Sequence, residues 1–200
     1  MTYGAALPAR RAANWWTRVR DYAGAPLPAE VQARLTRADV RLALVQSQIA
    51  VLDAAQRAAV AAAPVDSPAR RLAQLKGVGA TSIATLLEEG LVWRAFQNRR
   101  QVGGVLGFAP THYASGELVR DRGISHAGNR RLQSVAIQLA WGWVRWQRAS
   151  PMTQWFVARF GTGKRARRIG IVAVARKLVI ALWRVATTGA VPDGAVLKAA

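Results

Sequence analysis

Apolar residues recur at a regular spacing in one long stretch of the chain. Between Pro28 and Pro64 there is neither glycine nor proline. The apolar positions follow a heptad pattern, at Leu35, Ala38, Leu42, Val45, Ile49, Leu52 and Ala59. This pattern predicts one long helix whose apolar stripe needs a partner. The partner is either the chain's own domain or a second helix in a coiled coil. The few heptads and their interruption at Gln56 leave both interpretations open.

Helix caps and helix breakers predict shorter helices in the rest of the chain. Their expected ranges are 68–75, 80–89, 98–106, 129–146, 151–160 and 167–188. Asn98 and Asn129 are predicted N-caps, and Gly90 and Gly189 are expected to end two of the helices. Residues 107–123 are expected to form a loop, with a small hairpin around Ser115.

The predicted fold class is therefore mostly α. It consists of a long coiled-coil-like helix followed by a helical domain that contains a helix-hairpin-helix. The expected divisions are a helical connector with a coiled-coil arm at 1–66, the helical domain at 67–190 and a tail at 191–200.

The charge of the chain is strongly positive and unevenly distributed. Lysine and arginine total 29 against 10 acidic residues, which gives a net charge of +19. Residues 1–69 hold eight basic and five acidic residues, a net charge of +3, whereas the rest of the chain holds 21 and five, a net charge of +16. Such a field attracts polyanions, so nucleic acid is the expected partner of the second part. The alternative is a protein of a GC-rich genome, which explains the preference for arginine but not the excess over acids.

Composition excludes several classes of protein. The chain has no cysteine, which excludes disulfides, thiolate zinc sites and cysteine nucleophiles. Two histidines, His112 and His126, are too few for a histidine-rich metal site. No signal peptide is visible at the start, and the most apolar stretch, residues 169–186, carries three charged residues, so no membrane span is expected. We therefore expect a folded cytoplasmic, nucleoid-associated protein without a metal site of its own.

A glycine-containing turn is the first candidate binding site. The sequence Leu75-Lys76-Gly77-Val78-Gly79 lies between the first two short helices. This is the pattern of a helix-hairpin-helix, in which glycines permit a positive φ and a close approach to a DNA phosphate. Lys76, Gly77 and Gly79 are therefore candidate contacts to the DNA backbone. The alternative is a tight turn between two helices that binds nothing.

A serine followed by several arginines is the second candidate. Ser115 stands beside Gly116, and further polar and basic residues follow, at Arg120, Arg122, Ser125, His126, Arg130 and Arg131. Phosphoryl transfer by a serine needs an activated hydroxyl and positive charge on the phosphate oxygens, which arginine supplies. The residues taken alone favour a simpler interpretation, in which Ser115 is a turn residue and the arginines bind phosphate.

Basic residues gather again before the last helix, in the sequence Gly163-Lys164-Arg165-Ala166-Arg167-Arg168. A Walker phosphate loop needs serine or threonine after its Gly-Lys, so a nucleotide site is rejected here. We expect instead contacts to nucleic-acid backbone by Lys164, Arg165, Arg167 and Arg168. Four tryptophans could stack on bases, although helical spacing favours the core for most of them: Trp141, Trp143, Trp146 and Trp155.

The order and spacing of several motifs give a specific resemblance over residues 72–188. The motifs are Leu75-Lys76-Gly77-Val78-Gly79, Trp93-Arg94-Ala95-Phe96, Gly104-Val105-Leu106-Gly107-Phe108-Ala109-Pro110, Tyr113-Ala114-Ser115-Gly116, Gly123-Ile124-Ser125-His126-Ala127-Gly128-Asn129-Arg130-Arg131-Leu132 and Ile171-Val172-Ala173-Val174-Ala175-Arg176-Lys177-Leu178. This part resembles the C-terminal domain of insertion-sequence transposases of the IS-one-ten type, which are relatives of the Piv-type DNA invertases. Residues 10–60 resemble the helical connector that precedes this domain.

The resemblance implies a recombinase that cuts and rejoins DNA through a serine. The serine of the family's Ser-Gly motif matches Ser115, with Ser125 as the second choice. The resemblance also implies a structured guide RNA as a partner and a homo-oligomer, for which the helix at 35–59 is suited.

The family enzyme also has a ribonuclease-H-like domain, whose four acidic residues bind a divalent metal, expected to be Mg²⁺. The acidic residues of the connector match none of these four: Asp21, Asp39, Asp53 and Asp66. We therefore expect a truncated transposase, with no metal ligands in this chain. The alternative function is a nucleic-acid-binding remnant without catalysis.

Overall fold

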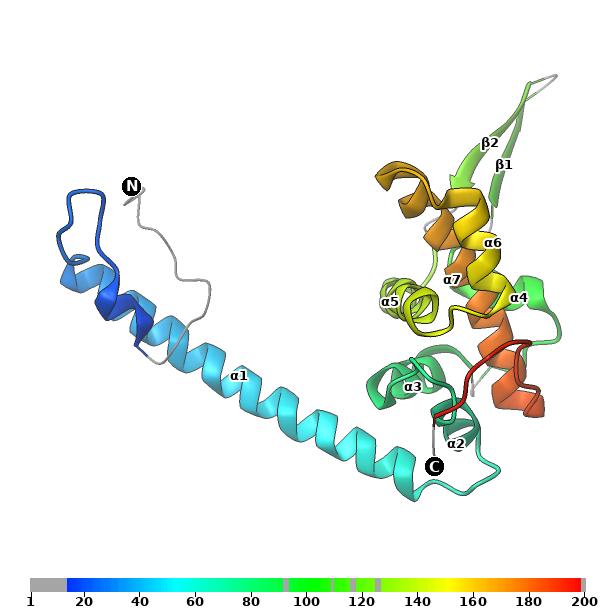
Figure 1. Cartoon of the computed structure of the whole chain (residues 1–200), viewed down its shortest axis with the longest axis horizontal. Helices are drawn as coiled ribbons and strands as arrows, with labels where there is room; N and C mark the ends of the chain where they lie inside the picture. The colour runs from blue at the N-terminus through cyan, green and yellow to red at the C-terminus, as the bar shows by residue number, and fades with distance from the viewer. Residues whose placement is uncertain (1–13, 92–93, 109, 116–117, 125–126, 199–200) are drawn as a thin grey trace. The chain divides into compact units, whose positions relative to one another are not determined.

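The structure is a computed structural model that describes residues 14–91, 94–108, 110–115, 118–124 and 127–198 (Figure 1). Helices account for most of these residues. In chain order the elements are η1 Trp15–Arg18, α1 Ala29–Ala62, α2 Pro68–Ala73, α3 Ala80–Leu86, η2 Leu87–Leu91, α4 Arg99–Val105, β1 Pro110–Ser115, β2 Leu118–Ile124, α5 Arg130–Trp146, α6 Pro151–Phe160 and α7 Lys164–Thr188. The prediction of a mostly α fold is confirmed.

The chain divides into two compact units, Met1–Ala54 and Ala55–Ala200. In the first unit, Trp16, Val19 and Leu27 are buried beside the start of α1. The long helix is confirmed, but α1 itself contributes no buried residue. Its apolar stripe is exposed at Leu42, Val45, Ile49 and Leu52. The pairing of this stripe with a second helix stays a prediction.

Most helices of the second unit lie where the sequence predicts them, and their caps explain why. The side chain of Asn98 accepts hydrogen bonds from the first amides of α4, and that of Asn129 does the same for α5. Pro68 and Pro151 occupy first-turn positions, where a missing N–H costs nothing. Gly189, in the left-handed region with φ 76°, ends α7.

Three predicted helix boundaries differ from the structure. Helix α2 ends at Ala73, before the predicted Leu75, because the backbone of Leu75 pairs with Leu197 instead. Helix α3 changes after Leu86 into the π-helical turn η2, which runs to Leu91, so Gly90 does not end the helix as predicted. Helix α7 begins at Lys164, three residues before the predicted start, because Gly163 with φ 94° ends the preceding loop.

The predicted hairpin around Ser115 is present, but it is longer than predicted, because its strands occupy most of the predicted loop at 107–123. Strands β1 and β2 pair antiparallel, with Ser115 opposite Leu118 and Pro110 opposite Ile124. The ladder contains an irregularity between Pro110 and His112. The hairpin extends away from the helices of its own unit (Figure 1).

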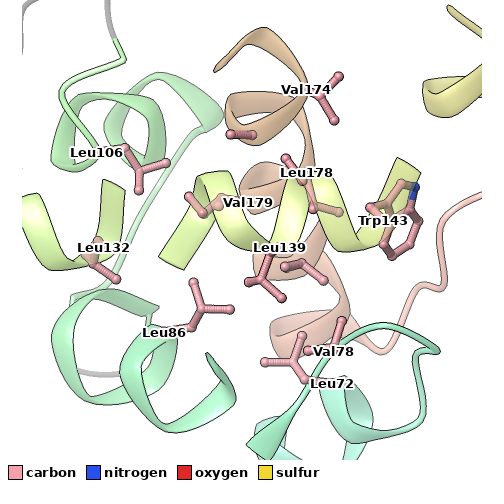
Figure 2. Packing of buried hydrophobic residues seen from close by; sticks show 14 of the residues in the cluster. Leu72, Val78, Leu86, Leu106, Leu132, Leu139, Trp143, Val174, Leu178 and Val179 are labelled. Atoms are coloured by element: carbon pink, nitrogen blue, oxygen red, sulfur yellow. The ribbon is translucent and has the colours of Figure 1, made fainter. Parts of the chain in front are cut away.

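The core of the second unit is built around α7 and α5. Buried residues recur along α7 at helical spacing, at Ile171, Val174, Leu178, Leu182 and Val185. Figure 2 shows Leu139 and Trp143 of α5 packed among Leu72, Val78 and residues of α7. Trp143 is only 1% exposed, and its indole N–H donates to the Ser150 hydroxyl at 3.2 Å. Among the described residues, no helix combines the length and hydropathy that crossing a bilayer requires.

Candidate functional site

The turn between α2 and α3 is held by the C-terminal segment of the chain. Gly77 has φ 92°, a conformation that favours glycine. The Lys76 amide donates to the Val196 carbonyl at 3.0 Å, and the Lys198 amide donates to the Gln74 carbonyl at 2.7 Å. Residues 196–198 therefore pair with the turn as a short added strand. The helix-hairpin-helix assignment itself stays a prediction.

A buried glutamine holds the turn and the C-terminal segment together through hydrogen bonds. Gln147 is 0% exposed. Its side-chain N–H groups donate to the carbonyls of Lys76 at 2.8 Å and Val196 at 2.9 Å, and its carbonyl accepts from the Val196 amide at 2.6 Å. One side chain thus joins the turn, the end of α5 and the C-terminal segment. Sequence reasoning missed it, because a single glutamine after an apolar helix face has no pattern of its own.

Replacement of Gln147 by leucine should lower the free energy of unfolding by roughly 2–4 kcal/mol, because backbone groups of Lys76 and Val196 lose buried partners. Gln138→Leu is the matched control, since Gln138 is an exposed glutamine on the same helix and should change stability by less than about 0.5 kcal/mol. Urea unfolding of both variants measures the difference. Equal stability of the two variants would contradict the role given to Gln147.

Two ammonium groups flank the turn. The Nζ of Lys198 donates to the Val78 carbonyl at 2.8 Å, and burial lowers the pKa of Lys198 below its ordinary value. Lys76, a predicted contact to the DNA backbone, directly precedes Gly77 and is exposed. Gly79 is also exposed, and a Cβ there would meet nothing within 4 Å. Lys76, Gly77 and Gly79 therefore lie together at one accessible turn, and Lys198 joins them.

The start of α5 brings acidic and basic side chains together. The Asn129 side-chain amide donates to one carboxylate oxygen of Glu89 at 2.6 Å, and the Arg131 guanidinium donates to the other at 2.8 Å. Arg131 is thus partly engaged in an ion pair, although its side chain stays 67% exposed. Arg130, next to it, is exposed as well.

Two glycines, Gly107 before β1 and Gly128 after β2, allow two backbone segments to cross at close distance. Gly107 has φ 62°, and a Cβ on Gly128 would lie 2.2 Å from the Gly107 nitrogen. The Asn129 amide donates to the Val105 carbonyl at 3.1 Å in the same place. A cavity of about 580 Å³ opens beside this crossing, lined by Arg94, Phe96, Gln101, Gly104, Gly128 and Asn129 among others. This crossing fixes the point at which the hairpin leaves the helices of the second unit.

The hairpin separates the predicted serine from half of its predicted arginines. Ser115 ends β1, and Arg120 and Arg122 follow on β2, with Arg120 opposite Tyr113. From Leu118 to Ile124 the strand covers six steps, or roughly 20 Å. Arg130 and Arg131 lie beyond that far end. The backbone thus groups Ser115 with Arg120 rather than with Arg130 and Arg131. Ser125, the second choice, lies outside the described residues.

Basic side chains also gather at the start of α7. Lys164, Arg165, Arg167 and Arg168 are exposed on its first turns, and no acidic residue lies in the first turn. The Arg167 guanidinium lies 5.7 Å from the ring centre of Trp141 and 5.8 Å from that of Phe156. Cations at a helix N-terminus are disfavoured by the helix dipole, so this cluster is suited to an anionic partner.

A metal site is not formed by the described part of the chain. No group of three or more histidine, aspartate or glutamate side chains comes together there in a way that could hold a metal ion. The described residues therefore do not fit the divalent metal that the resemblance implies.

Comparisons with known proteins place this chain beside insertion-sequence transposases. A sequence model of the transposase family IS116/IS110/IS902 matches residues 69–154, which include the turn at Gly77, the glycine crossing and Ser115. The transposase y4rJ of Sinorhizobium fredii is 42% identical over 187 residues, or 88% of this chain and 47% of that protein. The transposase y4qE of the same organism is 25% identical over 138 residues, or 58% of this chain and 35% of that protein.

The chain spans about half the length of y4rJ and about a third of the length of y4qE. The family match falls on the helical domain, and the 42% identity to y4rJ extends over 88% of the chain. The family match and the identity to y4rJ support the chain as a fragment of a transposase of the IS116/IS110/IS902 type.

Proposed function

We propose that this chain acts in DNA transposition, as the part of a transposase that binds DNA and carries the serine that cuts and rejoins a strand. One observation carries the proposal: the 42% identity to the transposase y4rJ extends over 88% of the chain. The net charge of +16 on the part after residue 69 supports DNA as the partner.

Contacts to the DNA backbone are proposed for four groups of residues. These are the turn with Lys76, Gly77 and Gly79, the arginines of β2, the start of α5, and the first turns of α7. Phosphate contacts of this kind fix a protein on the duplex without reading base sequence. The exposure of Lys76, Gly79, Arg130 and the four basic residues on the first turns of α7 supports this assignment.

Ser115 is the proposed nucleophile. Its hydroxyl loses the proton to a base, its oxygen forms a bond to the phosphorus of a DNA phosphodiester, and the bond from phosphorus to one deoxyribose oxygen breaks. That deoxyribose oxygen takes up a proton and leaves. Rejoining runs in reverse, when a hydroxyl of the new strand attacks the phosphoserine. Arg120, whose backbone pairs with Tyr113 two residues from Ser115, is the arginine proposed to neutralise the phosphate oxygens.

Three further features belong to the proposal through the family resemblance. The first is a structured guide RNA. The second is a homo-oligomer formed through α1, which the exposed stripe of Leu42, Val45, Ile49 and Leu52 supports. The third is a divalent metal held by a ribonuclease-H-like domain, in the same polypeptide or in a partner.

Salt dependence of DNA binding tests the proposed backbone contacts. The affinity of the chain for duplex DNA should fall by about 0.9 log units per log unit of salt for each phosphate contact. The triple variant K164Q, R165Q, R168Q should flatten this slope by about 0.9 for each contact it removes. Arg167 is left in place because it also contacts Trp141 and Phe156.

The matched control for this measurement is R34Q, R37Q, R41Q. It removes the same charge from exposed positions of α1, so it should leave the slope nearly unchanged. An equal change of slope in both triple variants would show that binding follows net charge and not the start of α7. A duplex affinity that does not respond to salt would contradict DNA-backbone binding altogether.

A further inference from the structure

Trp146 is exposed beside the turn between α2 and α3. It is the last residue of α5 and is 49% exposed, whereas Trp143 is 1% exposed and points into the core (Figure 2). Its neighbour Gln147 is fully buried beneath the turn. Two consecutive residues thus contact the same turn, one from within the core and one from the surface.

The indole of Trp146 rests against the glycine of that turn. A Cβ on Gly77 would lie 3.4 Å from Cδ1 and 3.6 Å from Cβ of Trp146, so the tryptophan lies in contact distance of the Gly77 backbone. The turn is held by Gln147 and by the pairing with residues 196–198. A large aromatic surface is therefore presented at a fixed place beside Lys76 and Gly77.

Two cations lie over this ring. Lys76 Nζ is 5.7 Å and Arg145 Cζ is 5.2 Å from the ring centre of Trp146. Both residues are exposed and have long, flexible side chains. Their charged groups can therefore turn from the ring to an anion at little cost in free energy. The surface thus offers one stacking platform and two phosphate-binding groups within reach of each other.

Two other partly exposed tryptophans, Trp141 and Trp155, pack against aromatic neighbours. Trp141 lies edge-on to Phe156 with 6.1 Å between ring centres, and Trp155 packs edge-on to Phe160 at 5.5 Å. Lys177 Nζ lies 3.5 Å from the ring centre of Trp155. Within the described residues, Trp146 has no comparable aromatic neighbour, so its exposed ring surface is available to a ligand.

We propose that Trp146 stacks on an unpaired base of a nucleic-acid strand, while Lys76 and Arg145 bind phosphates of the same strand. Every base has an apolar face that stacks on an indole, but in a duplex that face is covered by its neighbours. The site therefore distinguishes unpaired from paired nucleic acid. The inference rests on the proposed function, because cutting and rejoining of strands exposes unpaired bases.

The test uses the full chain and its Trp146→Ala variant, with three probes of equal length: oligo-thymidine DNA, oligo-uridine RNA and duplex DNA. Loss of one stacked base should weaken single-strand binding by roughly 5- to 150-fold. Duplex affinity should stay within about twofold, because the variant removes no charge. A loss with the DNA strand, the RNA strand or both supports the site, and the larger loss identifies the source of the unpaired base.

Two variants separate stacking from loss of structure. Trp146→Phe keeps a flat ring and should retain most single-strand affinity, and Tyr22→Ala removes an exposed aromatic of the other unit and should change nothing. Unchanged single-strand binding in Trp146→Ala, or an equal loss with the duplex, would overturn the inference. Failure of the wild-type chain to bind duplex DNA would count against the proposed function and not against stacking at Trp146.

Discussion

Gly128→Ala is expected to destabilise the domain by at least about 3 kcal/mol, and the variant should unfold at a clearly lower urea concentration than the wild type. A Cβ at this position would lie 2.2 Å from the Gly107 nitrogen, 2.3 Å from the Leu106 carbonyl carbon and 2.6 Å from the Val105 oxygen. All three atoms belong to backbone, which cannot turn aside as a side chain can. The crossing beneath the hairpin would have to open.

Gly104→Ala is the matched control for that prediction. Gly104 lies on α4, close to the crossing, yet a Cβ there would meet nothing within 4 Å. Alanine favours the helix over glycine, so this variant should be as stable as the wild type or up to about 1 kcal/mol more stable. If Gly128→Ala unfolds at the same urea concentration as Gly104→Ala, the close crossing at Gly107 is not present in solution.

Local signals predicted most of the helical architecture. Asn98 and Asn129 could be identified as N-caps because a capping side chain bonds to amides two and three residues ahead, within the same short stretch of sequence. The apolar face of α5 was visible for the same reason, since its spacing repeats every few residues. The hairpin was predicted from its turn residues around Ser115.

Contacts between distant parts of the chain could not be predicted in this way. The pairing of Leu75 with Leu197 and the hydrogen bonds of Gln147 join segments far apart in sequence. Nothing in the spacing of residues 191–200 indicates a partner, which is why this segment was expected to be a tail. The crossing of Gly107 and Gly128 is also non-local, although both glycines lie in motifs of the family resemblance.

The candidate serine illustrates a further limit of sequence reasoning. Proximity in sequence suggested that Arg120, Arg122, Arg130 and Arg131 surround Ser115 together. The hairpin changes this, because an extended strand carries Ser115 away from the start of α5. The assignment of Ser115 as nucleophile rests on the family resemblance, and the hairpin ladder groups Arg120, not Arg130 and Arg131, with this serine.

Ser115→Ala is expected to have the largest effect on activity, because it removes the oxygen that would bond to phosphorus. The measurement is the covalent protein–DNA adduct trapped on a nicked duplex, with a ribonuclease-H-like domain of the family and a divalent metal supplied. Ser125→Ala is the matched control, since it removes the other candidate hydroxyl ten residues away in the same sequence.

This adduct tests the proposed strand cleavage most directly. We expect the wild type and Ser125→Ala to form it in similar yield, and Ser115→Ala to fall to the background of a reaction without protein. The salt-dependent affinity of Ser115→Ala for duplex DNA should be unchanged, which separates chemistry from binding. An undiminished adduct in Ser115→Ala, or its loss in Ser125→Ala alone, would contradict Ser115 as the nucleophile.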